Sequence, residues 1–111
     1  MNWLPMTVTV MGLGAIAIAL PAQAEAPGIY YSWRSLEIDM DQCLVRSQAA
    51  LAGSALTDIV VDGNNVSGRS ETATALFICL ENAVDTTIML TIASNDDESA
   101  LLLREALKQA F

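Results

Sequence analysis

The first 24 residues carry no charged side chain, and residues 21–24 read Pro-Ala-Gln-Ala immediately before Glu25, the first charge. Val8–Leu20 is mostly apolar, and Ala22 and Ala24 supply the small side chains of an A-x-A cleavage pattern. Such a segment is typical of a secretory signal peptide. The sequence therefore predicts a signal peptide over 1–24, cleavage after Ala24, and a periplasmic or secreted protein.

A retained membrane anchor is the alternative for this segment. Leu4–Ala22 is close to the length of about 20 residues that a transmembrane helix needs. Pro5 and Pro21 interrupt it, however, and no basic residue precedes it to mark a cytoplasmic side. We therefore expect no stable membrane insertion after cleavage, and one small domain over residues 25–111.

The net negative charge of the chain makes some classes of binding partner unfavourable. The net charge is −8, from 13 acidic and 5 basic residues, and every one of them follows residue 24. Nucleic acids and anionic membranes attract basic surfaces, so the sequence argues against a nucleic-acid partner. The acidity is explained by solubility alone, with attraction to a basic partner or to divalent cations as the alternative.

The chain has only two cysteines, Cys43 and Cys79. A small exported domain has a marginal core, and paired cysteines in such a domain favour a disulfide. Cys43 lies on the apolar stripe of a predicted helix, and Cys79 shares one face of a predicted strand with Ala75 and Phe77. We predict a structural Cys43–Cys79 disulfide. Two free thiols and a redox-active pair are the alternatives, although the spacing is not that of a Cys-x-x-Cys motif.

Hydrophobic periodicity and capping signals place the secondary structure. Asp39 and Gln42 form a capping-box pattern before a helix over 40–52, and Asn95 with Glu98 forms another before a helix ending near Gln109. Strands are predicted at 30–38, 57–61, 66–69, 73–80 and 86–93, with Gly68 marking a bulge or an edge. We take the order as β-α-β-β-β-α. The predicted fold is α+β, a two-layer sandwich with a four-stranded, mainly antiparallel sheet and two helices on one face.

The chain offers little for catalysis. It has no histidine, which removes the commonest general base and the commonest metal ligand, so we expect no catalytic residue, metal or cofactor. An enzyme is the competing class, and it would be a carboxylate-based hydrolase. That chemistry would need two carboxyl groups, among Asp58, Asp62 and Glu81, paired in a deep pocket.

Tyr30, Tyr31, Trp33 and Arg34 form the one cluster with the composition of a recognition surface. The pleat of a strand sends Tyr31 and Trp33 to one face and Tyr30 and Arg34 to the other. The alternative is that the aromatic residues only cover the sheet. We also expect an apolar patch on the uncovered sheet face, and the residues expected to form it are Ile78, Leu80, Ile88 and Leu90.

Trp33, the Asp-Gln-Cys sequence ending at Cys43, and the Ala-Leu-Phe-Ile-Cys sequence ending at Cys79 resemble a group of small exported bacterial proteins of unknown function. The resemblance covers most of residues 33–111. It implies a two-layer α/β sandwich and supports the disulfide, but it implies no activity. We therefore expect an exported binding module whose partner is another envelope protein, a second copy or a small ligand. A structural envelope protein is the further alternative.

Overall fold

The computed structural model describes residues 25–111, so the predicted signal peptide lies outside the described residues. The elements are, in chain order, β1 (Gly28–Leu36), α1 (Met40–Gly53), β2 (Thr57–Asp62), β3 (Asn65–Arg69), β4 (Ala73–Glu81), β5 (Thr86–Ser94) and α2 (Asp97–Gln109). Among the described residues, no helix is both long enough and apolar enough to cross a bilayer.

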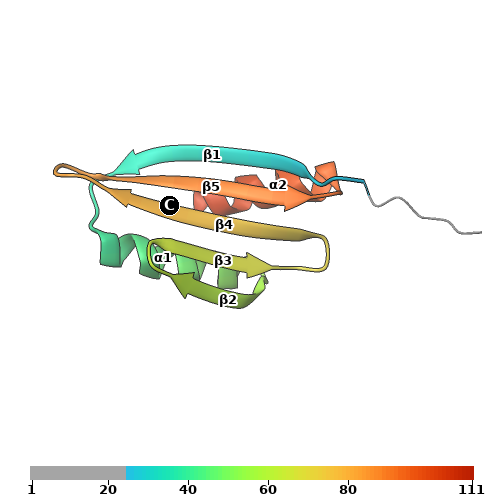
Figure 1. The fold of residues 1–111 in the computed structure, drawn as a ribbon, viewed down its shortest axis with the longest axis horizontal. Coiled ribbons are helices and arrows are strands. Elements are labelled where there is room, and N and C mark those ends of the chain that lie inside the picture. Colours follow the sequence, from blue (N-terminus) through green and yellow to red (C-terminus); the bar gives the residue numbers. More distant parts are fainter. Residues whose placement is uncertain (1–24) are drawn as a thin grey trace, which may run out of the picture.

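The strands form one antiparallel sheet in the order β1-β5-β4-β3-β2 (Figure 1). The predicted α+β class and antiparallel sheet are confirmed. The predicted count of four strands and the β-α-β-β-β-α order are wrong. All five segments predicted as strands belong to the sheet, and both arms of the hairpin at residues 62–65 are among them. The structure therefore has five strands in the order β-α-β-β-β-β-α.

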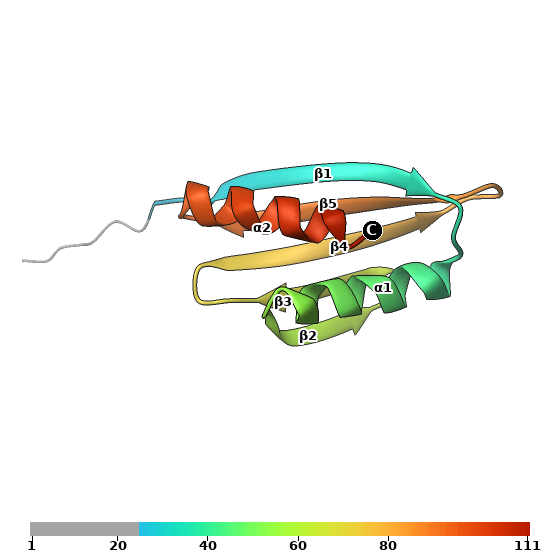
Figure 2. The ribbon, with the colours of Figure 1, turned by 180° about the vertical axis from the view of Figure 1, so that it is seen from behind.

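Both helices cover the same face of the sheet (Figure 2). α1 packs on β2, β3 and β4, whereas α2 packs on β1 and β5. Each helix therefore covers its own half of the sheet, and no other described element lies over the opposite face (Figure 1). We call this uncovered side the open face.

The core lies between the sheet and the two helices. Alternate residues of β4 and β5 are buried, which places Ala75, Phe77 and Cys79 beside Ile88 and Leu90. Leu51 of α1 and Leu107 of α2 close this layer from the helix side, each fully buried. Buried leucine, isoleucine and phenylalanine side chains each contribute about 1.5–3 kcal/mol through removal from water.

The predicted disulfide is present. Cys43 of α1 and Cys79 of β4 are bonded at 2.00 Å, and both are fully buried. The bond joins residues 36 positions apart and fastens α1 to the middle of the sheet. A loop of this size contributes about 3–4 kcal/mol on the chain-entropy model. Because no solvent reaches either sulfur, the geometry favours a structural bond over thiol exchange.

The predicted N-cap residue is correct for α1 but not for α2. Asp39 caps α1 as predicted, and the side chain of Gln42 accepts a reciprocal hydrogen bond from the Asp39 amide. The prediction of Asn95 as the cap of α2 is wrong, because Asp96 occupies that position and accepts from the Ser99 amide and hydroxyl. Those two bonds, first the backbone bond and then the hydroxyl bond, lower the pKa of Asp96 below its ordinary value.

Gly68 of β3 pairs with Ala75 of β4. On its other side it lies opposite the irregular part of β2, where Asp58 and Ile59 fall between the pairs Thr57–Arg69 and Val60–Ser67. The prediction of a bulge at this point is confirmed, although the extra residue belongs to β2, and β3 is not an edge strand. A Cβ atom at this position would lie 3.2 Å from the Cβ of Leu56 and 3.6 Å from that of Leu51. Glycine is needed here because the end of α1 and the segment after it approach the sheet closely.

Candidate binding surface

The strand pleat divides the predicted aromatic cluster between the two faces of β1. Tyr31 and Trp33 point to the open face, where they are 59% and 63% exposed. Tyr30 packs against the core on the helix side, and Arg34 lies opposite the buried Ile88. The predicted alternation is confirmed, and the four residues do not form one contiguous surface.

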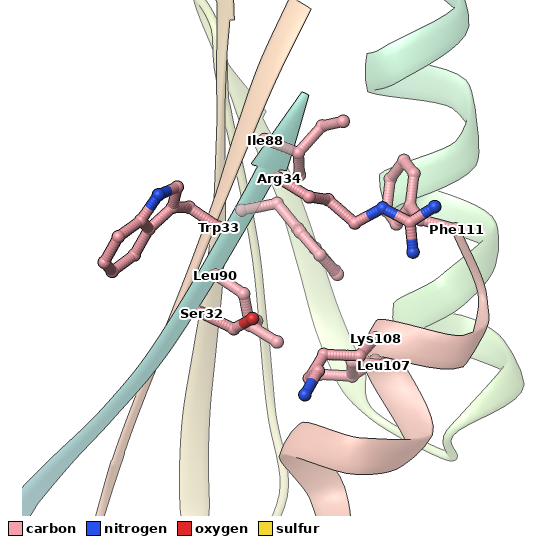
Figure 3. Close-up of a pocket in the computed structure, with 9 residues that line it drawn as sticks. Ser32, Trp33, Arg34, Ile88, Leu90, Leu107, Lys108 and Phe111 are labelled. Atoms are coloured by element: carbon pink, nitrogen blue, oxygen red, sulfur yellow. The ribbon is translucent and has the colours of Figure 1, made fainter. Parts of the chain in front are cut away.

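The helix-side members of the cluster have local partners. The Tyr30 hydroxyl donates a hydrogen bond to the Asp97 carboxylate, which ties β1 to the first turn of α2. Arg34 lines a recess with Lys108 and Phe111, and its side chain points away from Trp33 (Figure 3). These contacts give Tyr30 a structural role and leave Arg34 at the margin of the helix layer.

The recess is too small to be a ligand site. Its volume of about 20 Å³ corresponds to roughly one water molecule. Phe111 closes it by packing its ring 5.2 Å from that of Phe77, with the Arg46 guanidinium 4.9 Å above the Phe111 ring. Sites for small organic ligands commonly have about 300–1,000 Å³. The wider hollows of the described residues are open to solvent.

On the open face, Tyr31 and Trp33 form a stacked pair. Their ring centroids lie 5.8 Å apart, and the two planes differ by 7°. Ile29 extends the same row of β1 and is 59% exposed. Large, rigid aromatic side chains bury much surface for little lost side-chain entropy, which is why they are favoured at interfaces.

The aromatic pair continues into rows that cross the sheet. Trp33 lies opposite Met89 of β5, and Met89 lies opposite Ile78 of β4. In the next row, Tyr31 is opposite Thr91, and Thr91 is opposite Leu76. Because the register is regular, these side chains share one continuous surface.

The apolar patch was predicted only in part. Ile78 and Leu80 do lie on the open face, where Leu80 is 44% exposed. Ile88 and Leu90 do not, because they pair with Cys79 and Phe77 and are each only 3% exposed beneath the helices. The apolar residues of the open face that the prediction missed are Met89 and Leu76. The alternation of Met89 with Ile88 and Leu90 was visible, but which set faces the helices depends on the register with β4.

Charged side chains are absent from the open face of β1, β5 and β4. This statement rests on the alternation and register of three strands that the structure describes in full. Arg34 and Glu81 are the charged residues of these strands, and both lie at helix-side positions. A surface without charge is unusual in a chain of net charge −8, and it removes the main cost of burying this face against another molecule.

The carboxylates that a hydrolase would need do not converge. Asp58 and Asp62 are exposed on β2. Glu81 is exposed at the end of β4, where its carboxylate accepts a hydrogen bond of 3.1 Å from the Met40 amide. Residues 25–111 hold no cluster of three or more histidine, cysteine, aspartate or glutamate side chains arranged to bind a metal ion.

Comparison with protein-family models gives no match, and comparison with curated proteins gives none either. The resemblance to small exported bacterial proteins therefore stays a prediction. The function is therefore inferred from the residues exposed on the open face.

Proposed function

We propose that this protein is an exported binding module and that its open face is the binding surface. The observation that carries the proposal is the part of the open face formed by β1, β5 and β4, which has no charged side chain and is centred on the stacked Tyr31–Trp33 pair. Monomeric soluble proteins rarely expose large contiguous apolar patches, and patches of this kind commonly mark interaction sites. The partner is another envelope protein or a second copy of the chain.

Export is supported by two independent features. The charge-free leader predicts cleavage after Ala24. The buried Cys43–Cys79 disulfide belongs to an oxidising compartment, because cytoplasmic thiols are kept reduced. N-terminal sequencing of the protein recovered from the culture should give Glu25 as the first residue. An intact Met1 terminus on the recovered protein would contradict this part of the proposal.

The binding role is supported over carboxylate hydrolysis by the geometry on both sides of the sheet. The helix side offers a recess of about one water molecule, and the three carboxylates considered for hydrolysis are exposed and separate. On the open face, β1, β5 and β4 offer a broad surface without charged side chains instead.

The test is oxidative footprinting of the protein in the native envelope fraction, compared with the purified protein. Trp33 and Met89 should be protected from oxidation in the envelope if a partner covers the open face. Leu102 is the matched control, because it is 68% exposed but lies on α2. Equal oxidation of Trp33 and Met89 in both samples would contradict the proposal.

A further inference from the structure

The outer edge of β1 has the features of a strand-pairing site. All nine residues of β1 pair with β5 in unbroken register, from Gly28 opposite Ser94 to Leu36 opposite Thr86. Within residues 25–111, β1 is the last strand of the sheet on this side, and no strand of this part of the chain lies beside its outward amide and carbonyl groups. The strand contains no proline and no lysine, and Arg34 is its only charge. A long, regular edge of this kind is a template for another strand.

The opposite edge carries the protective features that β1 lacks. β2 has six residues, and its register with β3 shifts between Thr57 and Val60. Asp58, within this irregularity, has a positive φ of 52°. Asp58 and Asp62 add two negative charges to the edge. Bulges and charges of this kind prevent edge-to-edge pairing, so only β1 is available.

We infer that β1 pairs antiparallel with β1 of a second copy of this chain. The strand is self-complementary in the register centred on Ser32, its middle residue. That register overlaps all nine positions and places Tyr31 opposite the partner's Trp33. It also places Arg34 opposite the partner's Tyr30, so that no like charges face each other across the pair.

The geometry of this pairing has a further consequence for the aromatic surface. In a continuous antiparallel sheet, the twofold axis is perpendicular to the sheet, so both open faces lie on the same side. The stacked Tyr31–Trp33 pairs of the two copies then meet at the junction and form one uncharged surface. The two α2 helices lie side by side on the other face, because each α2 covers β1 and β5 of its own copy (Figure 2).

This pairing concerns the backbone edge of β1 and goes beyond the proposed function of the open face. The first experiment is hydrogen exchange of the exported protein, together with its mass in solution. In an unpaired edge strand, alternate amides point outward and exchange rapidly. A dimer in which every amide from Ile29 to Leu36 is protected supports the pairing. A monomer at all concentrations, or a dimer whose outward β1 amides still exchange rapidly, would overturn it.

Covalent trapping tests the register. Residues opposite each other in an antiparallel pair have Cα atoms about 4.5–5.5 Å apart, within reach of a disulfide. Ser32→Cys should therefore give a covalent dimer on mild oxidation. Arg34→Cys is the matched control on the same face of the same strand, and it should not cross-link because its twin lies several residues away. Equal cross-linking of both variants would overturn the register.

A pair of lysine substitutions tests which edge is used. Tyr31 and Val60 lie in the same row on the open face, at the β1 and β2 edges, with similar exposures of 59% and 55%. Tyr31→Lys should weaken dimerisation at least about tenfold, because it places a charge across the junction. Val60→Lys should leave it unchanged, and the reverse result would overturn the inference.

Discussion

The two halves of the sheet are stabilised by different means. The β2 half has a short, bulged, acidic edge and is fastened to α1 through the buried Cys43–Cys79 disulfide. The β1 half has a long, regular edge and is joined to α2 through the Tyr30–Asp97 hydrogen bond and the Asp96 cap. The covalent cross-link therefore lies in the half of the sheet whose edge is closed to other strands. The open edge and the exposed aromatic residues lie in the half without a covalent cross-link.

The largest expected effect is removal of the disulfide. The double variant Cys43→Ala/Cys79→Ala should lose about 3–4 kcal/mol of unfolding free energy, because the unfolded chain regains the entropy of a long loop. Urea denaturation measures this loss. Hydrogen exchange should rise first in α1, β2 and β3, while β1 keeps its protection. A uniform rise in hydrogen exchange over both halves would contradict the expected difference in stability between them.

The second effect is overpacking at Gly68. Gly68→Val should cost about 1–3 kcal/mol, because its side chain would meet Leu56 and Leu51 where α1 approaches the sheet. Urea midpoints measure the change. Gly53→Ala is the control, since no atom lies within 4 Å of a Cβ there, and it should be neutral or slightly stabilising. A stable Gly68→Val protein would show that α1 adjusts more freely than we expect.

The third expected effect concerns the buried hydrogen bond that connects β5 with the segment between β1 and α1. The Thr86 hydroxyl is fully buried and donates to the Ile38 carbonyl oxygen at 2.6 Å, just beyond the end of β1. Thr86→Val keeps the shape and leaves that carbonyl without its donor, so it should cost about 1–2 kcal/mol. Thr91→Val on the open face should be nearly neutral. Equal Tm values for the two variants would contradict this role.

The smallest effect is the pH dependence of the α2 cap. The pKa of Asp96 is lowered by the Ser99 amide and hydroxyl. A lowered folded-state pKa adds stability above the ordinary aspartate value, and this stability is lost as the pH falls through the folded-state pKa. Asp96→Asn should therefore have a lower Tm at pH 7, and the difference should close as the pH falls through the folded-state pKa of Asp96. A difference that stays constant with pH would show that the charge contributes nothing.

Some local features could be predicted because neighbouring residues decide them. Asp39 and Gln42 lie three positions apart and cap the same helix turn, so the start of α1 follows from the sequence. The alternation of β4 placed Cys79 on the same face as Phe77, which was enough to predict the disulfide. At α2, Asn95 and Asp96 are equally good caps locally. A tertiary contact accompanies the use of Asp96: the Ser94 hydroxyl donates to the Thr72 carbonyl and accepts from the Asp96 amide.

The candidate surface was predicted less completely, because it depends on contacts between distant segments. The alternation of Tyr31 and Trp33 follows from the pleat of one strand. The exclusion of Ile88 and the inclusion of Met89 follow only from the pairing of β5 with Cys79 and Ile78 on β4. A shift of that register by one residue would exchange the two sets between the faces.

The sequence by itself therefore determined the α+β class, the cap of α1, the faces of β1 and β4, and the disulfide partners. These follow from short-range periodicity and from the count of two cysteines. The tertiary structure alone decided that both hairpin arms join the sheet, that Gly68 accommodates α1, and that β1 and β2 form the edges. Strand order and helix placement arise from burial of residues far apart in the chain, which no local pattern records.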